Sequence, residues 1–171
     1  MSDLVPRREA IRLLQGDRRA IEGALARLSS RQIAAPGLGG GEWSPKDLLG
    51  HLESWEEHAL GALEAWSRGE PAPIDRALRD VGLTRVNAEE IARKSQRSVA
   101  KALSSSSATR DALLASMRSM SEATWAEPPT RRARTPLGIR LGQILAGPDA
   151  LFRHDDAHIA ALRAFGSGSR G

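Results

Sequence analysis

Residues 43–69 of the 171-residue chain read WSPKDLLGHLESWEEHALGALEAWSRG, and this stretch decides the fold class. Its apolar residues recur every three or four positions, which predicts one amphipathic helix. Ser44 is a suitable N-cap, Pro45 suits the first helical position, and Asp47 stands where a capping-box carboxylate bonds back to the cap. The helix should end at Gly69, because two prolines follow closely and prevent it from resuming.

The remaining chain shows the same periodicity. Apolar residues recur at three and four positions throughout, whereas strict alternation of apolar and polar residues is scarcely found. Tyr is absent and Phe occurs twice, so residues that favour sheets are few. We therefore expect an all-α fold, a four-helix bundle joined by mostly short links. The bundle should form a single domain over residues 1–165, followed by a flexible C-terminal tail over residues 166–171.

Two early boundaries follow from the same pattern. The first helix should span about Arg7 to Ser29, with Arg18 interrupting its apolar stripe. The connection between Gly69 and about Arg85 is long, which makes it a candidate pocket wall.

The second half of the chain has less definite boundaries. Residues 86–121 form either one long helix or two helices broken at Ser104–Ser107, and the spacing leaves both alternatives open. The last helical segment should have two parts divided at Gly147. Pro148 is expected to restart the helix, with Asp149 in its first turn.

Composition excludes several classes of protein. The net charge is +4, and the basic run of Arg131, Arg132 and Arg134 has no interleaved aromatic residues, so we expect a solvated loop and no nucleic-acid partner. Without Cys there is no disulfide, thiolate metal site or cysteine nucleophile, so any metal must bind His and carboxylates. No apolar run reaches about 18 residues, so we expect a cytoplasmic protein with no membrane partner.

The four histidines carry the clearest chemical pattern. His154 and His158 stand four residues apart, and on a helix this spacing places both imidazoles on one face, about 6 Å apart at Cβ. A helical wheel puts both at the border of the apolar arc and Asp155 in its middle. A carboxylate in a core needs a partner, so Asp155 should be paired.

The other two histidines, His51 and His58, lie on one border of the helix predicted over residues 44–68. Neighbouring helices of a bundle can bring His51 toward His154 and His158. Three neutral imidazoles leave open positions on a divalent ion, which suits Zn²⁺ and is acceptable to Ni²⁺ or Fe²⁺. The alternative is that each histidine is simply hydrogen-bonded at the edge of the core.

Other residues near these histidines have more than one interpretation. The preferred interpretation of His58 is a solvated residue at the border of the core. The alternatives are a fourth metal ligand or a base beside the metal. Glu56, on the opposite border, either orients a ligating imidazole or pairs with an arginine. Trp55, His58 and Asp155 are candidate pocket residues.

The segment WSPKDLLGHLESWE at Trp43–Glu56 and the later segment HDDAH at His154–His158 together resemble the pattern of the DinB-like superfamily. The resemblance implies a bundle of the DinB/YfiT type, frequently dimeric, with a divalent ion held by His51, His154 and His158. The stretch from Trp43 to Trp66 is also similar to the DfsB/ClbS-like branch of that superfamily.

Function is implied by this resemblance rather than by the fold. Members include thiol-dependent transferases and isomerases, presumed hydrolases, and ClbS-like proteins that inactivate a reactive metabolite. We therefore expect a homodimeric, metal-dependent transferase or hydrolase that acts on a small electrophilic molecule, with a low-molecular-weight thiol as a candidate cofactor and its catalytic residues unassigned. The alternative is a non-catalytic protein that sequesters a small molecule, or a ClbS-like resistance protein, without a required metal.

Overall fold

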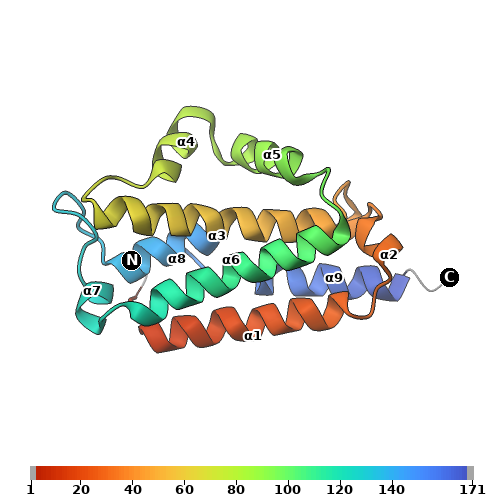
Figure 1. The fold of residues 1–171 in the computed structure, drawn as a ribbon, viewed down its shortest axis with the longest axis horizontal. Coiled ribbons are helices and arrows are strands. Elements are labelled where there is room, and N and C mark those ends of the chain that lie inside the picture. Colours follow the sequence, from red (N-terminus) through yellow and green to blue (C-terminus); the bar gives the residue numbers. More distant parts are fainter. Residues whose placement is uncertain (1–2, 169–171) are drawn as a thin grey trace.

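The computed structural model describes residues 3–168, and these residues form helices and turns with no strand. Three long helices run side by side, α1 (Arg7–Leu25), α3 (Pro45–Ser67) and α6 (Val99–Ser119) (Figure 1). The shorter α8 (Leu137–Ala146) packs against α3, and α9 (Asp156–Gly168) packs against α1. The all-α prediction is confirmed.

The segment between α3 and α6 forms two further helices, α4 (Pro73–Val81) and α5 (Leu83–Lys94). Both lie along α3 on the side away from α1, where the connection was expected to form a pocket wall (Figure 1). Among residues 3–168, none of the helices has both the length and the apolar character needed to cross a membrane.

The long helix α3 begins and ends where its sequence signals stand. Ser44 and Asp47 form a complete capping box, with the Ser44 amide donating to the Asp47 carboxylate at 2.9 Å. At the other end Gly69 adopts a φ of +74°, and its amide donates to the Trp66 carbonyl. These two caps fix the register in which His51 meets the rest of the bundle.

The first helix is shorter than predicted. α1 ends at Leu25 rather than near Ser29, because Ser29 starts a second helix, α2 (Ser30–Ala34), through a capping box with Gln32. A single 3₁₀ turn, η1 (Leu38–Gly40), then leads to α3.

Residues 86–121 belong to two helices, but the predicted position of the break between them, Ser104–Ser107, is wrong. The chain breaks earlier, and the Ser98 hydroxyl caps α6 by accepting from the Lys101 amide at 3.1 Å. The serine run lies inside α6, where the buried Ser106 accepts a hydrogen bond from Arg18 at 2.9 Å. The run stays helical because its inward hydroxyls have charged partners in the core.

Pro148 does not restart the last helix. After the short α7 (Glu122–Ala126) and α8, the chain makes turns up to Asp155, and α9 begins only at Asp156. The reason is Phe152, which is buried, adopts a φ of +64° and stacks on Trp125. A left-handed residue of this kind cannot lie within an α-helix.

The end of the chain also differs from the expected tail. α9 continues to Gly168, so residues 166–168 are helical. Residues 169–171 of the expected tail lie outside the described part of the chain.

Buried apolar side chains form two clusters, and a layer of charged side chains lies between them. We call this the charged layer, and it consists of Arg18, Glu56, Arg110 and Asp155, all of them buried. Along the chain, each charged residue has a residue of one apolar cluster before it and a residue of the other cluster after it. These flanking pairs are Leu14 and Ile21 for Arg18, Leu52 and Ala59 for Glu56, Ala102 and Leu113 for Arg110, and Phe152 and Ile159 for Asp155.

Candidate metal centre

The first half of the site comes from α3. His51 lies in the second turn of this helix and is 6% exposed. The Trp43 ring lies against it, with ring centroids 5.0 Å apart. The capping box at Ser44 and this aromatic contact together restrict where the His51 imidazole can lie.

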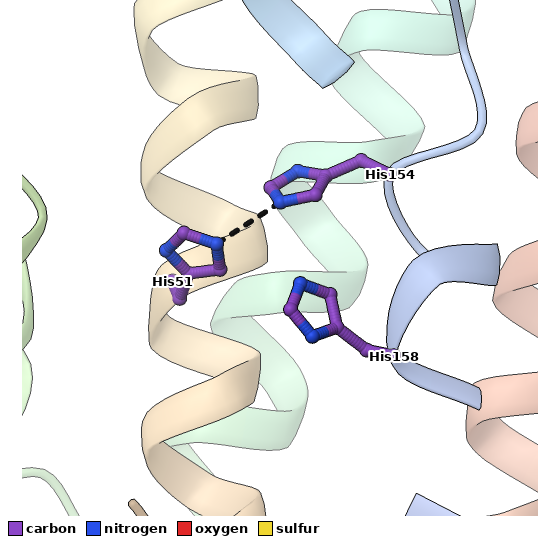
Figure 2. Close-up of side chains that lie close together, drawn as sticks. All are labelled: His51, His154 and His158. Carbon is purple, nitrogen blue, oxygen red and sulfur yellow. Dashed lines mark hydrogen bonds between the residues drawn. The ribbon is translucent and has the colours of Figure 1, made fainter. Parts of the chain in front are cut away.

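The second half of the site comes from the turn before α9 and from the first turn of α9 itself. We expected His154 and His158 to share one helix face, and that is wrong for His154, which lies in the turn. The three imidazoles nevertheless converge (Figure 2). His51 Nε2 and His154 Nε2 are 3.0 Å apart, and one ring nitrogen from each histidine lies within 4.8 Å of the other two.

The surroundings keep all three imidazoles neutral at neutral pH. Burial and the neighbouring His154 and His158 lower the pKa of His51 to about 3. Burial and His158 likewise lower the pKa of His154 to about 4, and burial lowers the pKa of His158. A neutral imidazole has a lone pair available for a metal ion, so the protonation state suits metal binding.

The charged layer lies directly behind His154. Asp155 accepts from Arg18 Nε at 2.7 Å through one oxygen and from Arg110 Nη2 at 2.9 Å through the other. Both arginines also donate to Glu56 Oε1. Burial alone would raise the pKa of Asp155, but the charges of the two arginines outweigh it and hold this pKa below its usual value. Asp155 is therefore an ionised anchor for the turn that carries His154.

A cavity of about 430 Å³ opens beside the histidines. His51, His154 and Trp55 contribute to its wall, and α4, α5, α8 and the turn after α8 supply the rest. Most of the wall is apolar, including Leu78 and Ile144. Its volume lies in the range of small-molecule sites, which are mostly apolar with a few placed polar groups.

The comparisons with known proteins agree with this architecture. Residues 13–147 match the family model described as the DinB superfamily, which is well over half of the chain. The chain belongs to the DinB superfamily. The matched DinB region includes His51 and ends before His154 and His158, so it is geometry that brings the last two histidines into the site. No curated protein and no solved structure matches the chain.

The donor set of this DinB chain fits a divalent ion. Tetrahedral Zn²⁺ with bonds of about 2.0–2.1 Å separates its ligand nitrogens by about 3.3 Å. His51 Nε2 and His154 Nε2, 3.0 Å apart, lie near that spacing, and a ring nitrogen of His158 lies within 4.8 Å of a ring nitrogen of each. The neutral state of all three imidazoles, and the position of His51 and His154 at the wall of a cavity, fit an ion that keeps an open position.

The other predicted site residues of the DinB chain have distinct places. Trp55 lines the cavity and donates from Nε1 to Asn87 Oδ1 at 3.0 Å. His58 does not join the metal-capable group among the described residues, and its Nε2 lies 3.6 Å from Glu90 Oε1. Burial lowers the pKa of His58, although Glu90 and Glu57 act in the opposite direction. Of the two interpretations of Glu56, the arginine pairing is the one present.

Sequence reasoning missed several residues of this region of the DinB chain. Arg18 appeared only as an interruption of an apolar stripe, and that interruption was the available signal for a buried charge. Arg110 had no such signal, because its partners come from distant segments. Asn87 and Gln143 line the cavity and belong to segments in which no motif marked them.

Proposed function

We propose that this chain is a divalent-metal-dependent enzyme that transfers a group to, or hydrolyses, a small electrophilic molecule bound in the cavity. The observation that carries the proposal is the convergence of three neutral imidazoles, two of which, His51 and His154, line a largely apolar cavity. When bound, the ion supplies Lewis acidity that makes a water or a low-molecular-weight thiol nucleophilic near neutral pH.

The chain's own residues have separate roles in this proposal. His51, His154 and His158 hold the ion with ring nitrogens. Asp155 is fully committed to Arg18 and Arg110, so it acts as a positioning residue for His154 rather than as a ligand or a base. Trp55 supplies apolar wall against the non-reacting part of the substrate.

Metal analysis of the purified full chain tests the site. Wild type should hold about one ion per chain after incubation with Zn²⁺ and removal of the excess. His154→Ala and His158→Ala should lose most of it, since two imidazoles bind far more weakly than three. His58→Ala is the matched control, because it removes a half-buried histidine outside the group and should leave the metal content unchanged. Equal metal content in all four proteins would refute the site.

Turnover is a separate measurement. Electrophilic substrates should react faster with protein present, with and without an added thiol, and a chelator should remove the acceleration. Acceleration that survives both chelation and His154→Ala would refute metal-dependent catalysis.

A second candidate function is non-catalytic sequestration of a small molecule, favoured by the extent of the apolar cavity wall around Trp55. In that case ligand binding, followed by tryptophan fluorescence, should be stoichiometric and indifferent to metal. Product formation beyond one equivalent per chain would exclude it.

A further inference from the structure

Two side-chain amides in the cavity wall have their oxygens occupied by groups that can only donate. Trp55 Nε1 lies 3.0 Å from the amide oxygen of Asn87. An indole N–H has no acceptor capacity, so the atom that faces it must be the Asn87 oxygen. The NH₂ group of Asn87 is therefore the end that remains for other partners.

Gln143 repeats this arrangement on α8. Arg140 Nη1 lies 3.0 Å from the amide oxygen of Gln143. A guanidinium also donates only, so the Gln143 oxygen is fixed in the same way and its NH₂ group remains. Within residues 3–168, no hydrogen bond leads from either amide nitrogen to a protein acceptor.

The charged groups of the same wall cancel one another. Arg140 Nη2 donates to both carboxylate oxygens of Asp75, at 2.8 and 2.9 Å. This ion pair, in which one guanidinium nitrogen contacts both carboxylate oxygens, ties α8 to α4 and leaves the wall without net charge from these two residues. Selection in this part of the cavity therefore depends on the donors of Asn87 and Gln143 rather than on a net charge.

We infer that the cavity binds a largely apolar small molecule through an acyl oxygen, which accepts hydrogen bonds from the NH₂ groups of Asn87 and Gln143. Carbonyl and carboxylate oxygens are both acyl oxygens that accept hydrogen bonds. A cationic amine is excluded, because it only donates and the NH₂ groups in the wall also donate. The inference rests on the proposed function, in which this cavity holds the substrate, and it names the substrate class and two specificity-determining residues.

Binding of three matched probes to the full chain tests the inference. Phenylacetamide, phenylacetate and phenethylamine share one apolar body and differ in the polar end. Isothermal titration calorimetry should give Kd values for the amide and the carboxylate about tenfold lower than for the amine, as expected for one or two net hydrogen bonds. Measurements with and without Zn²⁺ separate the contribution of the metal from that of the wall.

Isosteric variants identify the donors. Asn87→Asp keeps an acceptor for Trp55 but replaces NH₂ by an oxygen, and Gln143→Glu does the same toward Arg140. Each should weaken phenylacetate by about tenfold and strengthen phenethylamine, whereas phenylacetamide should change less because its own NH₂ group can donate to the new oxygen. Gln96→Glu makes the same chemical change at an exposed position and should leave all three Kd values unchanged. Far-UV circular dichroism and thermal unfolding verify that each variant is folded.

The outcomes that overturn the inference are specific. Equal Kd values for the three probes, tighter binding of the amine, or absence of binding of every probe at millimolar concentration would each do so. The same holds if neither isosteric variant changes the preference. If the wild-type chain does not bind Zn²⁺ but still prefers the amide and the carboxylate over the amine, the proposed metal site is refuted instead. The two failures are therefore distinguishable.

Discussion

Arg18 Nε donates to Asp155 Oδ2 across 2.7 Å, although 137 residues separate the two in the chain. This bond connects α1 to the turn that carries His154, and Arg110 on α6 binds the other oxygen of the same carboxylate. Two helices, α1 and α6, thus hold the residue next to His154. The ring of His154 can face His51 only while this turn keeps its place.

Asp155→Asn should lower the free energy of unfolding by roughly 3–5 kcal/mol, the usual cost of removing one partner from a buried ion pair. The variant keeps the shape of the side chain and leaves the charges of Arg18 and Arg110 without their second carboxylate. Urea denaturation measures the change. Asp80→Asn, in the exposed pair with Arg76, is the control and should change stability by less than about 0.5 kcal/mol. Similar effects of the two substitutions would contradict a structural role for the charged layer.

Zn²⁺ should stabilise the wild-type chain against thermal unfolding. An ion that binds only the folded state at about a hundred times its Kd adds about 2.7 kcal/mol. His51→Ala should show little of this stabilisation, because one of the three imidazoles is missing. His58→Ala should respond as wild type does. Differential scanning calorimetry with matched Zn²⁺ concentrations makes the comparison, and a full Zn²⁺ response in His51→Ala would argue against the site.

Stability of the metal-free chain should depend on pH through the histidines. In the folded state the pKa of His51 is lowered to about 3 and that of His154 to about 4, so the unfolded chain binds more protons below the ordinary pKa of about 6.5. The contribution of the histidines to the free energy of unfolding should therefore be fully present above about pH 6.5. It should fall as the pH drops toward about 4, by up to about 1.4 kcal/mol per pH unit for each histidine.

Urea titrations of the metal-free chain at several pH values test this dependence. His51→Gln should reduce the slope, since one titrating group is lost. An unchanged slope in that variant would assign the pH dependence to other groups.

Gly142→Ala should destabilise the chain. A Cβ at this position of α8 would lie 2.9 Å from Phe152 Cε2 and 3.0 Å from Leu151 Cβ, and overpacking of this kind typically costs about 1–3 kcal/mol. Gly16→Ala in α1 is the matched control, because its Cβ meets nothing within 4 Å and a helical Gly→Ala change should stabilise by about 0.5–1 kcal/mol. Chemical denaturation of both variants decides, and effects of the same sign would count against close packing of α8 on the turn.

Local signals in the sequence predicted helix α3 well because its caps use neighbouring residues. Ser44 and Asp47 are three positions apart, so their reciprocal hydrogen bonds depend on little beyond the local chain. The early end of α1 at Leu25 also has a local cause, because Ser29 and Gln32, three positions apart, form the capping box that starts α2. The break before α9 could not be predicted from the sequence, because the left-handed conformation of Phe152 accompanies its contact with Trp125 from another segment.

The sequence by itself determined the helical class, because its apolar residues recur every three or four positions. It also determined the membership in the DinB superfamily over residues 13–147 and which histidines are able to meet. Only the tertiary structure decided how they meet, since His154 reaches His51 from a turn and not from a shared helix face. The physical reason is that periodicity and caps act within a few residues, whereas the charged layer and the cavity wall join side chains from segments far apart in the chain.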